Sequence, residues 1–167
     1  AETRRAAREI AAARPKKMRA SGFPPLTLLH CVSNYPAAFE DLNLPAMLSL
    51  KKSLRLPTGL SDHTPGIEAS VAAAALGATV IEKHFTLDKK MSGPDHKASL
   101  SPDELKALVA AVRNIEKAMG DGVKRPVKGE AEMIRLVRKS LVAARDIRAG
   151  ERLSPGMVEL KRPGGGI

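Results

Sequence analysis

The chain has 167 residues, of which 43% are hydrophobic and 28% are charged, a composition typical of a globular domain. Its net charge of +10 lies at the two ends, and the central residues 20–123 contain nearly equal numbers of acidic and basic groups. Aromatic residues make up 2% of the chain, so platforms for stacking nucleic-acid bases are nearly absent. We therefore expect no nucleic-acid partner.

Targeting signals and membrane spans are also missing from the sequence pattern. No run approaches the roughly 18 apolar residues of a membrane span, and the chain opens with a basic, polar segment instead of a signal peptide. The single cysteine, Cys31, excludes an internal disulfide, fits a cytoplasmic protein without a membrane partner, and is expected to be a small buried residue. Ala1 at the start favours a fragment or a processed chain.

The first predicted elements alternate between helix and strand. Residues 2–19 are rich in Ala and Arg and predict a helix, which a loop at 21–25 follows. The apolar run 26–33 predicts a buried strand. A helix start with proline near its first position predicts a helix over 44–54.

The same alternation continues through the middle of the chain. Residues 57–61 and 79–85 predict strands, 68–76 an alanine-rich helix, and 102–119 a helix with a serine cap. Beyond 139 the short apolar pieces between Gly and Pro are more typical of strands than of helices. This order predicts an α/β fold with a parallel sheet, and three strands alone cannot close a barrel, so the chain indicates part of something larger.

Each of the three predicted strands ends in polar residues: Ser33-Asn34-Tyr35, Ser61-Asp62-His63 and Glu82-Lys83-His84. In parallel α/β folds the catalytic groups gather at this edge of the sheet. Strand alternation places Ser61 with His63 on one face and Glu82 with His84 on one face. Two imidazoles beside a carboxylate predict a metal site. Asp62 and Lys83 would point to the helix layer instead, where we expect them to pair.

Simpler interpretations remain open for several of these residues. The histidines could be ordinary residues at strand ends, and His30 is expected to pack in the core. The loop that contains Asp95 and His96 could be a turn with a capping aspartate or an acceptor of sugar hydroxyls. No glycine-rich phosphate motif occurs, so a nucleotide cofactor is not expected.

Six segments together resemble the sialic acid (N-acetylneuraminate) synthase family, with its legionaminate and pseudaminate relatives. They follow family order and spacing: LLHCVSNYP (28–36), GLSDHT (59–64), GATVIEKHF (77–85), GPDHKASL (93–100), RKSLVA (138–143) and KRPG (161–164). The resemblance implies that 1–123 are the last three strands of a TIM (β/α)8 barrel, 124–138 a linker, and 139–167 the truncated start of a small antifreeze-like (SAF, β-clip) domain.

The resemblance also assigns roles to residues. It implies that His63 and His84 bind a divalent metal, normally Mn²⁺, and that Glu82 manages a proton near the reacting carbon. The residues that it implies for substrate binding are Asn34, Tyr35, Ser61, Asp95 and Arg162. Of these, Ser61 would contact phosphoenolpyruvate and Asp95 the amino sugar. Arg162 would reach the partner subunit's active site in a domain-swapped homodimer.

The implied reaction condenses phosphoenolpyruvate with N-acetylmannosamine, or a related N-acylated amino sugar, and water, and releases phosphate. The form of the 93–100 loop favours the neuraminate and legionaminate branch over the pseudaminate branch. Without the early strands of the barrel, the chain alone is expected to be inactive. The alternatives are a legionaminate or pseudaminate synthase, another metal-dependent aldolase or 3-deoxy-sugar acid synthase, and a carbohydrate-binding or assembly module without turnover.

Overall fold

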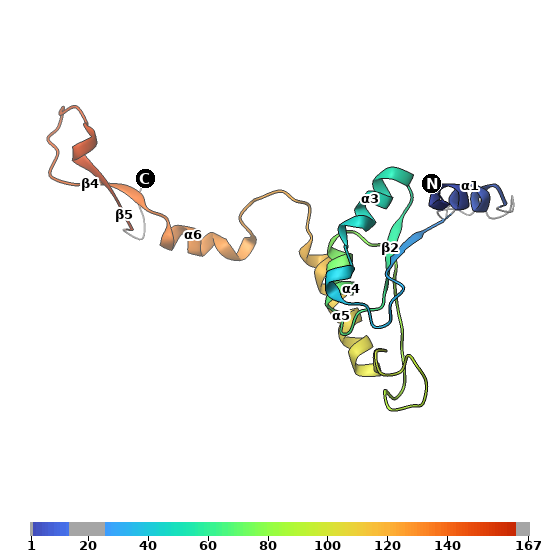
Figure 1. The fold of residues 1–167 in the computed structure, drawn as a ribbon. Coiled ribbons are helices and arrows are strands. Elements are labelled where there is room, and N and C mark those ends of the chain that lie inside the picture. The colour runs from blue at the N-terminus through green and yellow to red at the C-terminus, as the bar shows by residue number, and fades with distance from the viewer. Residues whose placement is uncertain (1, 14–25, 163–167) are drawn as a thin grey trace. The chain divides into compact units, whose positions relative to one another are not determined.

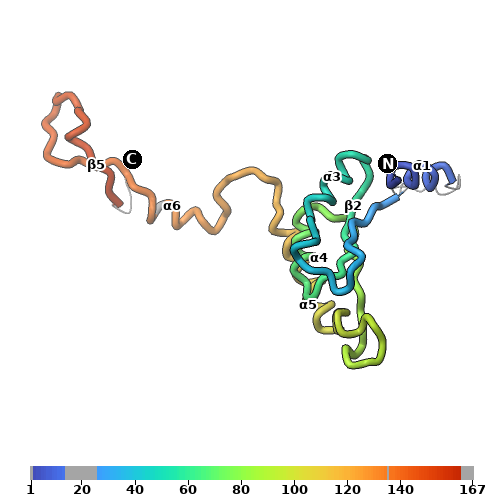
Figure 2. Tube along the Cα trace, viewed as in Figure 1, coloured from blue at the N-terminus to red at the C-terminus, as the bar shows by residue number. Residues whose placement is uncertain are grey.

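A computed structural model describes residues 2–13 and 26–162, which belong to two compact units that divide between Asp121 and Gly122 (Figures 1 and 2). Helix α1 (Glu2–Ala13) contains no buried residue. The predicted continuation of this helix to residue 19 and the predicted loop at 21–25 lie outside the described residues. No helix in the described ranges is long and apolar enough to cross a membrane.

The first unit is built on a three-stranded parallel sheet. Strands β1 (Leu28–Cys31), β2 (Thr58–Asp62) and β3 (Ile81–Lys83) lie in the order β1-β2-β3. The predicted parallel sheet is therefore confirmed, although β1 and β3 are shorter than expected. After β3, Phe85 forms an isolated parallel bridge with Leu100, which brings the end of the following loop beside the end of the strand.

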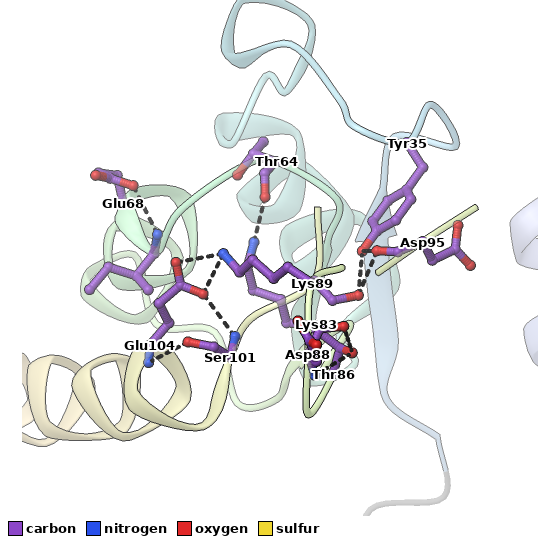
Figure 3. A network of polar contacts seen from close by, with 12 residues as sticks. Tyr35, Thr64, Glu68, Lys83, Thr86, Asp88, Lys89, Asp95, Ser101 and Glu104 are labelled. Atoms are coloured by element: carbon purple, nitrogen blue, oxygen red, sulfur yellow. Dashed lines mark hydrogen bonds and ion pairs between the residues drawn. The ribbon is translucent and has the colours of Figure 1, made fainter. Parts of the chain in front are cut away.

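Three helices accompany the sheet: α3 (Pro45–Leu54), α4 (Glu68–Ala75) and α5 (Pro102–Ala118). The start of α5 is the capping box that its sequence predicts. The Glu104 N–H donates to Ser101 Oγ at 3.4 Å, and the Ser101 N–H donates to Glu104 Oε2 at 2.8 Å. Lys89 also binds the Glu104 carboxylate at 2.6 Å, so the cap ties the preceding loop to the helix (Figure 3).

The core of this unit lies between the sheet and α4. Leu60 of β2 packs with Leu42, Ala69 and Ala73, and Ile81 of β3 packs against this cluster. The small alanines allow α4 to lie close to the strands. Leu60 and Ile81 point toward the helices. Because successive strand residues point to opposite faces, Ser61 and Glu82 lie on the other face of the sheet.

The second unit contains one short helix, α6 (Ala131–Val137), and an antiparallel pair of strands, β4 (Ser140–Ala143) and β5 (Val158–Lys161). Single 3-10 turns precede α6 (Lys128–Glu130) and β5 (Pro155–Met157), and one in the first unit covers Phe39–Asp41. The expected β character of the tail is confirmed. Helix α6 was not predicted, because its seven residues are too few for a clear helical period.

Gly59 in the middle of β2 occupies a position without room for a side chain. A Cβ added there would collide with the backbone carbonyl oxygen of Val80, and it would lie 2.8 Å from Cδ2 of Leu29. The neighbouring strands can therefore approach β2 only because this residue is glycine.

The substitution Gly59→Ala is expected to lower the free energy of unfolding by about 1–3 kcal/mol, because the sheet must shift to admit the methyl group. Urea unfolding followed by circular dichroism measures this loss. Gly129→Ala is the matched control, since nothing lies within 4 Å of a Cβ at that position. An equal effect of the two substitutions would contradict the packing argument.

Candidate functional site

The register of the sheet brings three side chains into one row on the face opposite the helices. Cys31 pairs with Ser61, and Ser61 pairs with Glu82. Ser61 Oγ donates a hydrogen bond of 2.6 Å to Glu82 Oε1, and Ser61 is buried. Two of the residues predicted to share this face are thus in direct contact.

The prediction that Cys31 is buried is wrong, because the side chain is exposed. It lies on the face of the sheet that the helices do not cover. His30 points the other way, where its Nε2 lies 2.7 Å from the Leu42 carbonyl oxygen. It is half-buried at the edge of the core and not one of the fully buried residues.

His63 follows β2 and is held in a defined orientation. Its Nδ1 lies 2.9 Å from the carbonyl oxygen of Val32, and Cys31 Sγ lies 3.9 Å from the same nitrogen. Because a carbonyl oxygen only accepts, the hydrogen bond places a proton on Nδ1 and leaves Nε2 available.

His84 follows β3, and its ring centroid lies 5.5 Å from that of His63. Its Nδ1 lies 3.8 Å from the Asp95 carboxylate oxygen Oδ2. The ring of Tyr35 contacts both imidazoles, with centroid distances of 5.1 Å to His63 and 4.3 Å to His84. Residues from the ends of all three strands therefore meet at one edge of the sheet.

A cavity of about 260 Å³ opens at this edge, and its lining residues are Ser61, His63, Glu82, Lys83 and His84. Four of these five are predicted site residues. A larger depression of about 360 Å³ lies between α4, α5 and the β3 segment, and most of its lining is aliphatic. Since it offers no cluster of metal-binding or acid–base groups, the smaller cavity is the candidate site.

The chemistry of the two imidazoles fits a divalent metal. Neither Nε2 atom takes part in a hydrogen bond within the described residues, and each Nδ1 faces an oxygen that orients its ring. The described residues contain no group of three or more His, Cys, Asp or Glu side chains placed to hold a metal ion. Glu82, beside the pair, is bonded to Ser61, so His63 and His84 would be the protein ligands that this chain supplies.

Two further predicted residues remain, one in each unit. Asn34 is exposed in the turn after β1, next to Tyr35. Arg162 is exposed in the second unit, directly after β5. Their predicted roles in substrate binding stay predictions.

Asp62 and Lys83 form the expected pair on the helix side of the sheet. Lys83 Nζ lies 2.9 Å from Asp62 Oδ2, and the two side chains are 4% and 0% exposed. Lys83 also donates to the carbonyl oxygen of Thr64 at 2.7 Å (Figure 3). The predicted ion pair is therefore confirmed, and it joins neighbouring strands directly beneath the candidate site.

The remaining partners of Asp62 could be found only in three dimensions. Ser70 of α4 donates to Oδ2 at 2.5 Å, and both the N–H and the hydroxyl of Thr64 donate to Oδ1. Burial alone would raise the pKa of Asp62, but the hydrogen bonds from Ser70, Lys83 and Thr64 outweigh it and hold the pKa below its ordinary value. One weak signal was present in the sequence, a lone serine within an alanine-rich helix.

Comparison with known proteins identifies the family that this chain resembles. The NeuB family model matches residues 2–124, and the SAF domain model matches residues 138–167. The N,N'-diacetyllegionaminic acid synthase of Campylobacter jejuni is 61% identical over 142 residues, which cover 85% of this chain and 42% of that protein. The pseudaminic acid synthase of the same organism is 47% identical over 144 residues, which cover 86% of this chain and 42% of that protein.

The solved structures agree with this assignment. The N-acetylneuraminic acid (sialic acid) synthetase of Leptospira borgpetersenii has a TM-score of 0.59 and 44% identity, over 66% of this chain and 39% of that one. The α/β fold of this chain with its parallel sheet is therefore similar to that of a solved sialic acid synthetase. The chain belongs to the NeuB family, and it spans less than half the length of the relatives that it matches.

The buried ion pair generates a pH-dependent prediction. Because the folded-state pKa of Asp62 is lowered, its ionised form contributes stability above the unfolded-state pKa of about 3.9, and this contribution is lost as the pH falls through the lower folded-state value. Asp62→Asn is expected to lower the free energy of unfolding by about 3–5 kcal/mol at pH 7, since it leaves Lys83 buried without its counter-charge. The difference in the free energy of unfolding between this variant and the unchanged chain should become smaller below about pH 4.

Urea unfolding at pH 7, 5, 4 and 3 measures this dependence. Glu116→Gln removes the exposed ion pair with Arg113 and is the matched control, with an expected loss of unfolding free energy much smaller than that of Asp62→Asn. A loss from Asp62→Asn that is equally small, or that stays constant down to pH 3, would contradict the electrostatic role.

Proposed function

We propose that the protein containing this chain condenses phosphoenolpyruvate with the open-chain form of an N-acylated amino sugar and releases phosphate. One observation carries the proposal: two oriented imidazoles with free Nε2 atoms meet Glu82 at one edge of a parallel sheet in a NeuB-family chain. The two relatives described above are both named as sugar-acid synthases, and their names support the same reaction class.

His63 and His84 would hold a divalent metal, Mn²⁺ by the family resemblance, which when bound supplies Lewis-acid chemistry at the sugar aldehyde. Ser61 holds Glu82 by a hydrogen bond of 2.6 Å, and Glu82 would take and return a proton of the reacting water or hydroxyl. Ser61 would also contact phosphoenolpyruvate. This arrangement fixes the acid–base group before the substrates bind.

The proposed reaction forms one carbon–carbon bond and breaks one carbon–oxygen bond. The terminal alkene carbon of phosphoenolpyruvate attacks the aldehyde carbon, whose oxygen takes up a proton. Water adds to the neighbouring carbon and gives up one proton, which balances the proton taken up at the aldehyde oxygen. Phosphate then leaves from that carbon with the electrons of the carbon–oxygen bond, the added hydroxyl becomes a carbonyl, and the proton of that hydroxyl passes to the phosphate. Asn34, Tyr35 and Asp95 would bind the sugar, and Arg162 would complete the site from the partner subunit of a domain-swapped dimer.

The choice of amino sugar can be inferred from the similar proteins and from the atoms that each substrate contributes. N-acetylmannosamine is the sugar first expected from the sequence. The relative that is 61% identical makes a product whose name contains two acetyl groups, and phosphoenolpyruvate contributes no nitrogen. A sugar that already carries two acetamido groups is therefore the alternative that the comparisons favour, ahead of the substrate of a pseudaminate synthase.

The proposal concerns a longer protein than this chain. We propose that residues 1–123 supply the last part of a cytoplasmic TIM barrel, and that 139–167 begin the SAF domain. The remaining strands would provide most of the phosphate-binding groups. The 167 residues alone would then be inactive.

The test is phosphate release by the full-length natural protein with phosphoenolpyruvate and each candidate sugar, with Mn²⁺ and after chelation. His63→Ala and His84→Ala should each reduce metal-dependent release to background, because each removes a metal ligand. His30→Ala is the control, since that imidazole contacts the Leu42 carbonyl on the opposite face of the sheet.

Full activity in both His63→Ala and His84→Ala would refute the metal assignment. A folded, Mn²⁺-loaded protein that binds the sugar but releases no phosphate with any of the sugars would refute the condensation. That result would favour a carbohydrate-binding module instead.

A further inference from the structure

We propose that Tyr35 is a positioning residue that sets the mutual orientation of the His63 and His84 imidazoles and couples them to the loop carrying Asp95. This inference rests on the proposed function, because it concerns the same site. It assigns Tyr35 a role beyond substrate contact. The ring packs against the two imidazoles, and the hydroxyl contacts the loop.

The ring of Tyr35 is packed against both imidazoles at once. It meets His63 edge-on, at 84° between the ring planes, and it meets His84 at 37° with a centroid distance of 4.3 Å. Since aromatic pairs prefer such edge and offset geometries, each contact favours one orientation of the imidazole. Tyr35 comes from the end of β1, so its ring braces side chains that follow β2 and β3.

The braced orientation matters because the polar restraint on His84 is weaker than that on His63. His63 is held through Nδ1 by the Val32 carbonyl, and His84 faces Asp95 at 3.8 Å, which is longer than a hydrogen bond. His84 is also exposed. The contact with Tyr35 is the closer of the two aromatic contacts of His84, since the ring centroids lie 4.3 Å apart against 5.5 Å for His63, and its loss should let the His84 imidazole turn.

The hydroxyl of Tyr35 reaches the loop that follows β3. It lies 3.3 Å from Ser99 Oγ and 3.5 Å from the Asp95 carbonyl oxygen (Figure 3). Ser99 is buried and donates from Oγ to the same carbonyl oxygen at 2.7 Å. His84 is therefore linked to Asp95 in two ways. Tyr35 contacts the His84 ring and the backbone at Asp95, and the Asp95 carboxylate faces His84 directly.

The rest of this loop is anchored independently of Tyr35. Thr86 Oγ1 lies 2.7 Å from His96 Nδ1, and Lys89 pairs with Glu104 of α5. Loss of the Tyr35 hydroxyl should therefore loosen the Asp95 turn without unfolding the loop. The ring and the hydroxyl can be separated by two substitutions, Tyr35→Leu and Tyr35→Phe.

The first experiment measures the geometry directly in the 167-residue chain by nuclear magnetic resonance of its four histidine rings. Tyr35→Leu should shift the ring signals of His63 and His84, and His30, which contacts the Leu42 carbonyl on the opposite face of the sheet, is the internal control that should not move. Tyr35→Phe should leave the ring signals of His30, His63 and His84 in place. It should instead speed amide exchange at Ala98 and Ser99, whose N–H groups donate to the Asp95 carbonyl oxygen.

The second experiment measures function in the full-length natural protein. Tyr35→Leu should weaken Mn²⁺ binding by about 10–100-fold in calorimetric titration, the range typical of changes behind metal ligands. Tyr35→Phe should keep the Mn²⁺ affinity within about twofold and raise KM for the amino sugar more than it lowers kcat. Ser99→Ala is the matched control and should reproduce the effect of Tyr35→Phe.

Unchanged histidine signals and unchanged Mn²⁺ affinity in Tyr35→Leu would overturn the positioning role of the ring. A loss of Mn²⁺ affinity in Tyr35→Phe as large as in Tyr35→Leu would overturn the separation of ring and hydroxyl. Failure of the proposed function looks different: the unsubstituted protein would then release no phosphate, while the shifted ring signals of Tyr35→Leu would still support the positioning role.

Discussion

The ion pair between Asp62 and Lys83 is the interaction on which the rest of the site depends. It joins β2 to β3 at their carboxyl ends, and Ser70 and Thr64 bring α4 and the turn after β2 into the same network. A charge pair with essentially no exposure is stable only when its remaining hydrogen-bonding capacity is satisfied. Here the network meets that condition, and so it specifies the register of the two strands.

That register decides which side chains face the cavity. With Asp62 and Lys83 toward the helices, alternation directs Ser61 and Glu82 to the opposite face, and His63 and His84 follow at the strand ends. The burial of Asp62 and Lys83 and the placement of the neighbouring side chains at the cavity are therefore set by the same strand register. A shift by a single residue would exchange them and bury the site residues.

The sequence was sufficient to predict the parallel sheet, its helices and the Asp62–Lys83 pair, because apolar period, caps and polar strand ends are local signals. It failed at Cys31, where residue type favours burial but strand alternation places the side chain on the uncovered face. Helix α6 was missed since it is short. The contacts of Tyr35 with His84 and Ser99 join residues far apart in the chain, and no local pattern encodes them.

The parallel pairing of the strands has a consequence for how the site comes into being. Parallel neighbours need a crossover of at least about a dozen residues, so Cys31, Ser61 and Glu82 reach one row only after two long loops have closed. The imidazole pair therefore forms only when the crossover between β2 and β3 has closed. An ion that prefers the assembled pair would draw the chain toward the closed sheet, so ligand concentration and folding equilibrium would be thermodynamically linked at this edge.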